Sequence, residues 1–512
     1  EPQPPMNLMM LLEMAAEGLG DRVAVGSLDD GLTYRQLYDR AHGAANRYRA
    51  AGVESAVVCD ESSPALPIAL FGSAWAGIPF VPLNYRLPAD DLLALAERAG
   101  SAVAIADESN LERLGGLPGV SCVSAEAFSA DPAAGTDGHA SPGDWNMDPD
   151  DLAVLLFTSG TTGSPKSAVL RHKHLVSYIL GSVEFMGAGE DEATLVSVPP
   201  YHIAGVASML SSVYAGRRIV QLPRFDPDVW IDTAEREGVT HAMVVPTMLT
   251  RIVDALDARG GAPMLGIRAL SYGGGKMPRP VIERALDLFP ITNFVNAYGL
   301  TETSSTISLL GPDDHRVAQY SDDPIEQQRL ASVGRPLPGV EVQVRDDDGT
   351  VLGPGEVGEI FVRGEQVAGE YREKGSLLDA DGWFPTRDGG FVDDDGYLFI
   401  QGRNDDVIIR GGENMSPGEI EDVAISHPGV RDAAAIGVPC REWGEKVVLL
   451  IVADGDAPDP DELDDLIRER LRSSRVPSHV EVVDELPYNE TGKLLRRVLR
   501  EQFAHLGDDP TD

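Results

Sequence analysis

A short loop rich in glycine and hydroxyl groups is the part of the chain best suited to chemistry. An apolar run, residues 154–157, leads directly into Thr158-Ser159-Gly160-Thr161-Thr162-Gly163-Ser164-Pro165-Lys166. Glycine lets backbone N–H groups approach a ligand closely, and a lysine supplies a compact positive charge for phosphate. A buried strand that ends in such a loop predicts a polyphosphate cradle. The spacing is not that of a Walker A loop. A surface linker, the alternative, is not expected to start at a buried strand and close on Pro-Lys.

A second group of candidate side chains follows another apolar run. Residues 294–297 predict a strand, and Tyr298, Thr301 and Glu302 follow it in close order. Tyr298 can stack on a base, Thr301 can donate to a phosphate, and Glu302 offers the carboxylate oxygens that Mg²⁺ prefers. Each residue is ordinary by itself, but the set predicts a nucleotide site.

Three successive glycines, residues 273–275, come directly after a third predicted strand, residues 269–272. Glycines at such a place let a flat group lie against the backbone. A tight turn from strand to helix explains the same glycines, so both readings stay open here. His202 also follows a strand, and a lone histidine there is usually a hydrogen-bonded structural residue.

The composition narrows the function. The 512 residues include 42 basic and 82 acidic side chains, a net charge of −40, which argues against a nucleic-acid or anionic-membrane surface. Lysine is scarce, and two of the six, Lys166 and Lys493, lie in sharp motifs. Three cysteines, Cys59, Cys122 and Cys440, predict neither a disulfide framework nor a metal cluster and favour the cytoplasm. No apolar run is long enough to predict a transmembrane helix.

The elements that must position these residues alternate between helices and short apolar strands, which predicts a layered α/β fold. Thr33 is a plausible N-cap for a helix from Tyr34 to about Arg49 that stops before Gly52. Residues 125–149 are rich in Ala, Asp, Gly, Ser and Pro and predict a flexible connection. Further helices are expected at 6–16, 67–76, 90–99, 171–185, 247–258 and 461–471, and further strands at 22–27, 57–59, 80–83, 102–106, 195–199, 240–245, 339–345, 358–363, 433–437 and 447–453.

Together the motifs resemble the adenylate-forming superfamily, which includes acyl-CoA synthetases, firefly-type luciferases and peptide-synthetase adenylation domains. The resemblance runs from about Leu32 to Arg500. It implies a large N-terminal adenylation domain, residues 1–403, of layered α/β subdomains with a β-rich subdomain, and a small mobile α+β C-terminal lid, residues 404–512. Ser167 and Arg387 stand where the family usually has glycine, and Tyr488 stands where it often has arginine.

The resemblance also implies roles for individual residues. Lys493, Thr301 and Glu302 would be catalytic, and Glu302 would hold Mg²⁺. Asp405 would be the hinge of the lid, Gly411 and Gly412 would line the CoA tunnel, and the acyl pocket would contain His202, Gly205 and Val206. ATP and AMP would be bound by Thr158, Ser159, Gly160, Thr161, Thr162, Gly163, Lys166, Gly273, Gly274, Gly275, Asn296, Tyr298, Gly299, Asp388 and Arg403.

The implied activity is that of an ATP-dependent acyl-CoA synthetase. It would activate a carboxylic acid as an acyl-adenylate and transfer the acyl group to CoA, with release of AMP and pyrophosphate. Fatty, aromatic and alicyclic acids all suit an apolar pocket, whereas no arginine stands out near His202 to favour a dicarboxylic acid. Three alternatives stay open: a ligase that loads a carrier protein, a luciferase-like oxygenase, and an ATP-binding regulatory protein without turnover. Neither a nucleic-acid partner nor a membrane span is expected, and both a monomer and a homodimer remain open.

Overall fold

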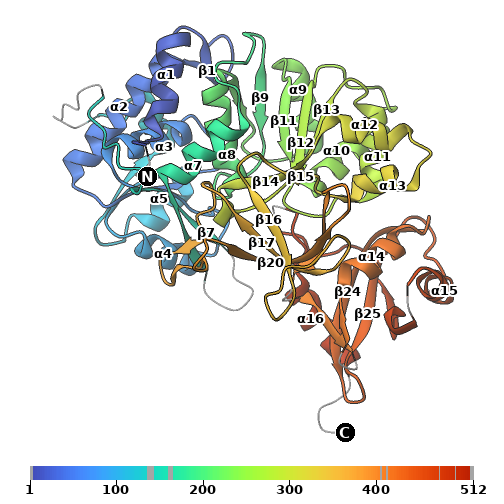
Figure 1. Cartoon of the computed structure of the whole chain (residues 1–512). Coiled ribbons are helices and arrows are strands. Elements are labelled where there is room, and N and C mark those ends of the chain that lie inside the picture. The colour runs from blue at the N-terminus through green and yellow to red at the C-terminus, as the bar shows by residue number, and fades with distance from the viewer. Residues whose placement is uncertain are drawn as a thin grey trace.

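The computed structural model describes residues 4–134, 143–158, 165–403, 406–410, 413–471, 473–489 and 492–507. Within these ranges the chain forms two large sheets, a small antiparallel sheet and a fourth sheet near the C-terminus (Figure 1). The predicted α/β class is confirmed. No helix of the described ranges is both long and apolar enough to cross a bilayer.

The first large sheet is built on short strands that are buried on both faces. Every residue of β3 (Ser55–Cys59) and β5 (Ala102–Ala106) is buried, and the two strands pair in parallel. Continuous apolar strands of this kind require helices on both faces of the sheet. The strand order is β19 (Gly375–Ser376), β18 (Glu370–Tyr371), β8 (Lys166–Arg171), β7 (Leu152–Thr158), β4 (Phe80–Pro82), β3, β5 and β6 (Val120–Ser124).

The second large sheet places the other two motifs next to each other. Its strands β12 (Ala269–Gly273) and β13 (Asn293–Leu300) are parallel neighbours, so the segments that follow them leave the sheet at the same edge. The strand order is β15 (Arg335–Pro336), β14 (Ser305–Leu310), β13, β12, β11 (His241–Val244), β9 (Ala193–Val196), β10 (Arg218–Gln221), β1 (Val23–Val25) and β2 (Leu32–Thr33).

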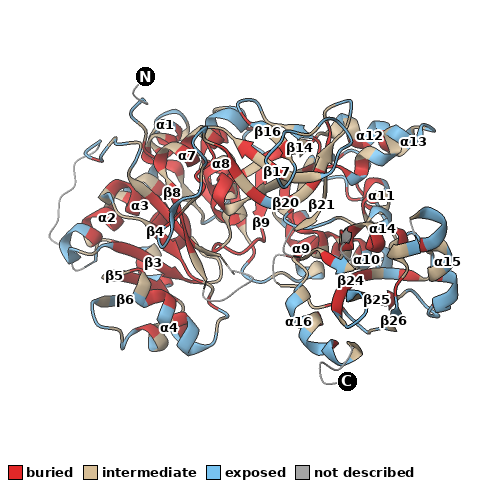
Figure 2. Cartoon of the chain, turned by 60° about the horizontal axis from the view of Figure 1, so that its bottom comes forward, coloured by how far each residue is buried: buried red, intermediate tan, exposed pale blue. Residues whose placement is uncertain are grey.

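Helices cover the large sheets and produce a five-layer arrangement. One hydrophobic core joins α1, α2, α3, α7 and α8 to strands of both sheets, so these helices lie between the sheets. Helices α4 and α5 cover the outer face of the first sheet, and α9, α10 and α11 cover that of the second. Figure 2 shows the buried residues concentrated in the strands and in these inner helices. The bounds are α1 (Met9–Leu19), α2 (Tyr34–Ala51), α3 (Ala65–Ala76), α4 (Ala89–Arg98), α5 (Glu108–Leu114), α7 (His172–Ser182), α8 (Ile203–Ala215), α9 (Pro227–Arg236), α10 (Pro246–Ala258) and α11 (Arg279–Leu288).

Local sequence determines where α2 begins and ends. Thr33 Oγ1 accepts a hydrogen bond from Gln36 N at 3.2 Å, and Gln36 Oε1 accepts one from Thr33 N at 2.8 Å, which is a capping box. Gly52 ends the helix with φ +61°, in the left-handed region that glycine enters without strain. The predicted start at Tyr34 and the predicted stop before Gly52 are therefore confirmed.

The prediction of a flexible connection over residues 125–149 is wrong at its start. Residues Ala125–Ala130 form the short helix α6, and the Ser124 hydroxyl accepts a hydrogen bond of 3.1 Å from Ala127 N. Phe128 is fully buried against the helices between the sheets. The burial of this single aromatic side chain, which the composition of the segment obscures, stabilises the helix.

The smaller sheets follow in the second half of the chain. A four-stranded antiparallel sheet contains β16 (Glu341–Arg345), β17 (Gly358–Arg363), β20 (Phe384–Val392) and β21 (Leu398–Arg403), and helices α12 (Pro312–Tyr320) and α13 (Pro324–Gln328) precede it. The C-terminal part (orange to red in Figure 1) contains β22 (Ile408–Arg410), β23 (Glu413–Met415), α14 (Pro417–Ile425), β24 (Val430–Cys440), β25 (Gly444–Ala453), α15 (Pro460–Arg470), β26 (His479–Val482) and α16 (Arg496–Gln502).

Candidate functional site

The candidate residues meet where strands of the two large sheets end. β7 ends at Thr158, β12 at Gly273 and β13 at Leu300, and each strand is followed by one of the motifs. Ligands of open α/β sheets bind outside the carboxyl ends of the strands. The C-terminal part brings Lys493 to the same place, because the preceding Gly492 lies against Thr247 and Gly275 and the charges of Asp388 and Glu302 act on the lysine.

Tyr298, Asp388 and Arg403 form a connected polar group. Tyr298 Oη donates a hydrogen bond of 2.6 Å to Asp388 Oδ2, and Arg403 Nε lies 3.7 Å from Asp388 Oδ1. Burial raises the pKa of Asp388, while the charge of Arg403 opposes that rise. Burial also raises the pKa of Tyr298 well above its usual value, so the phenol stays protonated and donates. Arg403 Nε is buried and has no hydrogen-bond partner among the described residues. This nitrogen therefore fits a ligand oxygen.

Glu302 is held from two sides by a segment that lies far along the chain. The amides of Ala368 and Gly369 both donate to its backbone carbonyl at 2.9 Å. The Tyr371 hydroxyl donates to its carboxylate oxygen Oε1. Glu302 is 9% exposed and forms no ion pair with another described residue. A buried carboxylate that forms no direct ion pair is costly, so this environment fits a bound cation.

The turn after Glu302 has a strained backbone. Ser304 and Ser305 have φ values of +57° and +105°, and non-glycine residues with such values cluster at functional sites. The buried amide of Gln366 spans the turn, because its Nε2 donates to Thr303 O at 3.1 Å and to Thr306 O at 2.7 Å. These two hydrogen bonds hold the strained turn in place.

The loop that carries Lys493 is closed on itself and lies against the second large sheet. Asn489 N donates to Lys493 O at 2.9 Å, and Lys493 N donates to Asn489 Oδ1 at 2.8 Å. A Cβ atom on Gly492 would lie 3.0 Å from Thr247 Oγ1, and one on Gly275 would lie 3.0 Å from Gly492 O. Burial lowers the pKa of Lys493, and the neighbouring charge of Arg403 lowers it further. The loop of Lys493 therefore lies against the strand ends that carry the other candidate residues.

A second contact joins the C-terminal part to the loop after β12. Lys276 forms an ion pair with Asp422, and its Nζ lies 3.3 Å from Gly418 O in α14. Lys276 directly follows the three glycines. The C-terminal part therefore contacts the loop after β12 through α14 as well as through the Lys493 loop.

Two of the glycines are required by packing inside the sheet. A Cβ atom on Gly273 would lie 2.1 Å from Ala297 O, and one on Gly299 would lie 1.8 Å from Ser305 O. Gly274 has φ +83°, which suits the tight turn that was the alternative reading. Asn296 is buried in β13, and its Nδ2 donates to Ser332 O at 3.0 Å.

The two ends of the phosphate loop are described, whereas Ser159, Gly160, Thr161, Thr162, Gly163 and Ser164 lie outside the described residues. Lys166 Nζ lies 5.5 Å from the centre of the Tyr371 ring. Ser167 is in extended backbone opposite Phe157, so it carries no left-handed strain in place of the usual glycine. Asp405, Gly411 and Gly412, the predicted hinge and CoA-tunnel residues, also lie outside the described residues.

The Ser167 hydroxyl belongs to a small ionic cluster. Ser167 Oγ donates to Glu373 Oε1 at 2.6 Å, Ser167 N donates to Glu373 Oε2 at 3.1 Å, and Arg98 Nη2 donates to Ser167 Oγ at 2.9 Å. Arg98 also forms an ion pair with Glu373. Burial alone would raise the pKa of Glu373, but the hydrogen bonds from Ser167 outweigh it and lower the pKa to about 2. The cluster fixes the end of the phosphate loop to the segment after β18.

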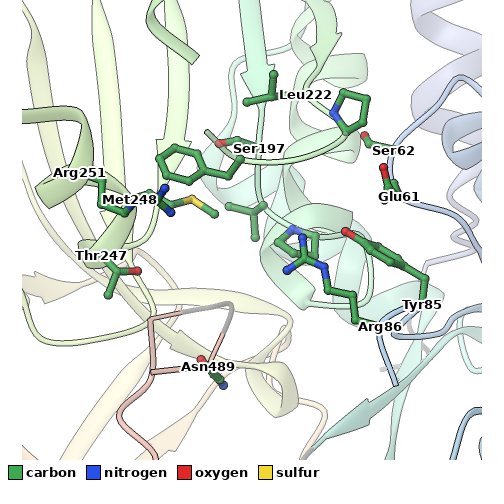
Figure 3. Close-up of a pocket in the computed structure, with 14 residues that line it drawn as sticks. Glu61, Ser62, Tyr85, Arg86, Ser197, Leu222, Thr247, Met248, Arg251 and Asn489 are labelled. Atoms are coloured by element: carbon green, nitrogen blue, oxygen red, sulfur yellow. The ribbon is translucent and has the colours of Figure 1, made fainter. Parts of the chain in front are cut away.

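A cavity of about 180 Å³ opens between the two large sheets and the C-terminal part (Figure 3). Ser197, Pro199, Thr247 and Met248 line it from the second sheet and its helix α10, and Asn489 lines it from the loop of Lys493. Arg86 and Arg251 lie on opposite sides of it. The sequence showed no arginine near His202, but the fold brings Arg86 and Arg251 from distant segments to the cavity that Pro199 also lines.

The predicted acyl-pocket residues lie close to this cavity in the chain without lining it. His202 precedes α8, and burial lowers the pKa of its ring to about 4, so the imidazole is neutral at pH 7. A Cβ atom on Gly205 would lie 2.6 Å from Pro199 O. Val206 is fully buried in the core between the sheets.

Arg387 explains why its position usually holds glycine. Its φ is +64°, a conformation that costs a residue with a side chain about 1–2 kcal/mol. The side chain is 62% exposed, and its Nε lies 3.9 Å from Glu359 Oε1. The strained residue directly precedes Asp388, so the unusual backbone conformation helps to set the direction of the Asp388 carboxylate.

Several residues that contact the site were missed from the sequence. Tyr371, Gln366, Glu373 and Arg98 stand in segments without a motif of chemically active residues. The isolated Gly369-Glu370-Tyr371 run offered no signal, because its importance comes from pairing with β8 across the chain. Among the described residues, no group of three or more potential ligands forms a metal site.

Comparisons with known proteins agree with this geometry. The family model described as AMP-binding enzyme matches residues 12–372, and that of the AMP-binding enzyme C-terminal domain matches residues 419–493. The fatty acid–[acyl-carrier-protein] ligase ScoC of Streptomyces coeruleorubidus is 33% identical over 488 residues, which cover 92% of each chain. A feruloyl-CoA synthase of Amycolatopsis sp. is 34% identical over 481 residues, which cover 92% of this chain and 94% of that protein. The solved O-succinylbenzoate coenzyme A synthetase from Bacillus subtilis, in complex with ATP and magnesium ion, has a TM-score of 0.81 at 28% identity and covers 97% of this chain and 99% of its own.

Proposed function

Because the chain belongs to the family of AMP-binding enzymes, we propose that it is an ATP-dependent acyl-CoA synthetase. It joins a carboxylic acid to CoA through an acyl-adenylate and releases AMP and pyrophosphate. The observation that carries this proposal is the packing of the Lys493 loop against Thr247 and Gly275 at the ends of the strands, where the charges of Asp388 and Glu302 act on the lysine. A nucleotide-binding protein without turnover would not explain why Glu302 and Lys493 stand together.

In the first half-reaction the acid's carboxylate oxygen attacks the α-phosphorus of ATP, and the bond to the pyrophosphate oxygen breaks. The chain contributes chiefly positioning and charge neutralisation. Lys493 lies between the attacking carboxylate and the α-phosphate, Thr301 donates to phosphate, and residues 158–166 cradle the remaining phosphates. The Thr301 hydroxyl has no hydrogen-bond partner among the described residues, which leaves it available for this role.

The nucleoside is held by residues that are already connected. Asp388 accepts the ribose hydroxyls, Arg403 donates its unpartnered Nε to ribose or phosphate, and the ring of Tyr298 lies against the base. The backbone of residues 273–275 and 299 lies along the same ligand. The relative from Bacillus subtilis was solved in complex with ATP and magnesium ion. In this chain Glu302 is the residue proposed to hold Mg²⁺. When bound, Mg²⁺ neutralises charge on the phosphates.

In the second half-reaction the CoA thiol attacks the acyl carbon, the thiol loses its proton, and AMP leaves with the electrons of the broken acyl–phosphate bond. We place the domain boundary between residues 403 and 404, with residues 1–403 as the adenylation domain and 404–512 as the lid. Rotation about Asp405 withdraws Lys493 and brings Gly411 and Gly412 to the CoA path. The seating of Gly492 on Thr247 supports the first-half-reaction position of the lid.

The proposed substrate is a fatty, aromatic or alicyclic acid, with His202 at its carboxylate end and Gly205 and Val206 in the wall of the acyl pocket. Because Arg86 and Arg251 line the cavity, acids with a second polar group are also candidate substrates. Cytoplasmic location is supported by the three free cysteines. A second candidate function is loading of a carrier protein, which the likeness to ScoC favours, since its name states that acceptor.

The test is pyrophosphate release from Mg·ATP across fatty, aromatic, alicyclic and dicarboxylic acids, with CoA, with an acyl carrier protein, and with neither. The proposal expects acid-dependent release that accelerates with CoA and yields acyl-CoA. Acceleration only with the carrier protein would move the assignment to the second candidate. Release that neither acceptor accelerates would favour the oxygenase reading, and no release with any acid would favour the non-catalytic binding protein.

A further inference from the structure

A tyrosine outside every recognised motif connects the three parts of the phosphate site. Tyr371 donates its hydroxyl to Glu302 Oε1. Its ring lies 5.5 Å from Lys166 Nζ, and the nearby Thr158 side chain opposes the rise in the pKa of its hydroxyl. Thr158 and Lys166 flank the phosphate loop, and Glu302 follows β13. One side chain therefore touches both ends of the loop and the proposed metal ligand.

The strand that carries Tyr371 is fixed to the loop's own strand by two acidic residues. On one side, Glu370 receives two hydrogen bonds from Arg171 in β8, at 2.7 and 3.0 Å. On the other side, Glu373 accepts the two hydrogen bonds that Ser167 of β8 donates. Tyr371 itself pairs with Ala168 of β8. Three successive attachments to one strand leave the phenol little freedom, so its position is set before any ligand binds.

The phenol orients the Glu302 carboxylate. The last torsion of a glutamate is broad and allows the two oxygens to exchange. A hydrogen bond to Oε1 removes that freedom and leaves Oε2 for another partner. The backbone of Glu302 is already held by the amides of Ala368 and Gly369. The same short segment, residues 368–371, thus fixes both the main chain and the side chain of this residue.

We propose that Tyr371 is a positioning residue that orients Glu302 for Mg²⁺ and ties that metal site to the phosphate loop. The inference rests on the proposed function, in which Glu302 holds the metal. Hydrogen-bond partners of metal ligands change metal affinity or activity by about 10–100-fold when they are removed. Tyr371 acts through Glu302 and Lys166 and touches no reacting atom.

The test is calorimetric binding of ATP at a series of Mg²⁺ concentrations without acid, so that no turnover occurs. Tyr371→Phe keeps the ring over Lys166 and removes the hydroxyl. We expect half-maximal ATP binding to require about 10–100-fold more Mg²⁺. The matched control is Tyr397→Phe, because Tyr397 is 2% exposed and donates to Asp314 Oδ1 at 2.6 Å away from the site. This control is expected to leave the Mg²⁺ requirement unchanged, and thermal unfolding of both variants checks that each is folded.

Glu302→Gln separates failure of this inference from failure of the proposed function. If Glu302→Gln raises the Mg²⁺ requirement and Tyr371→Phe does not, Tyr371 has no positioning role and the metal assignment stands. If Glu302→Gln leaves the requirement unchanged, the metal assignment itself is wrong. If both variants raise it, the double variant is expected to resemble Glu302→Gln alone, whereas fully multiplied effects would overturn an action of Tyr371 through Glu302.

Discussion

A methyl group added to Gly492 is expected to slow acyl-adenylate formation selectively. Gly492 has φ +71°, and its added Cβ would lie 3.0 Å from Thr247 Oγ1 and 3.4 Å from Val245 Cγ2. Thr247 belongs to the helix α10 of the second large sheet, whereas Gly492 precedes Lys493 in the C-terminal part. The crowding therefore exists only while Lys493 faces the site, and it disfavours that position of the lid.

The magnitude follows from two separate terms. Left-handed strain of about 1–2 kcal/mol is present in every position of the lid and lowers overall stability. Overpacking typically costs about 1–3 kcal/mol, and the lower end applies because one hydroxyl-bearing side chain can shift. A barrier change of about 1.4 kcal/mol is tenfold in rate. Adenylation by Gly492→Ala is thus expected to be roughly five- to tenfold slower, with thioester formation from supplied acyl-adenylate unchanged.

The assay measures the two half-reactions separately, as pyrophosphate release without CoA and as acyl-CoA formation from synthetic acyl-adenylate. Gly455→Ala is the matched control, because Gly455 has φ +82° in the same part of the chain and open space around it. It is expected to reproduce the strain without the kinetic effect. Thr247→Ala removes the nearest crowding atom, Thr247 Oγ1, and leaves only the ordinary contact of 3.4 Å with Val245 Cγ2, so it is expected to restore adenylation in the double variant. Equal slowing of both half-reactions, or no recovery with Thr247→Ala, would refute the seating of the lid on Thr247.

Three further predictions concern other residues. Lys493→Ala is expected to slow adenylation about 10²–10³-fold, as for loss of one transition-state donor. The control Lys374→Ala, at an exposed lysine, is expected to leave the rate of adenylation unchanged. Equal loss of thioester formation from supplied acyl-adenylate would contradict the role of Lys493. Glu373→Gln is expected to lower the free energy of unfolding at pH 7 by about 1 kcal/mol, after allowance for solvent screening. Because folding lowers the pKa of Glu373 from 4.5 to about 2, the difference from wild type in urea unfolding is expected to be complete above pH 4.5 and to shrink as the pH falls toward 2. A difference that stays constant with pH would contradict this prediction. Arg387→Gly is expected to raise the midpoint of urea unfolding. The release of about 1–2 kcal/mol of left-handed strain exceeds the roughly 0.4–1 kcal/mol that glycine costs by increasing the conformational freedom of the unfolded chain. A lower midpoint would show that the contact with Glu359 contributes more than the strain.

Features that depend on neighbouring residues were predictable from the sequence. The capping box of Thr33 and the left-handed Gly52 delimit α2 through contacts within four residues, so both ends of that helix were predicted correctly. Strands β3 and β5 were predicted from short apolar runs. The family followed from the order of the motifs and is confirmed by the match over residues 12–372. The roles of the individual site residues remain predictions that the experiments above test.

Only the tertiary structure decided which side chains meet. Tyr371 reaches Glu302 across 69 positions of the chain, and Arg98 reaches Glu373 across 275. The short helix α6 is stabilised because Phe128 packs into the core between the sheets. The sequence of residues 125–130 alone does not show that this core is there. Caps, turns and strand propensity act between close neighbours and are written in the local sequence. The direction of a buried carboxylate, the seating of a lysine loop and the partner of a lone tyrosine depend on how whole sheets pack, and that packing is a property of the entire chain.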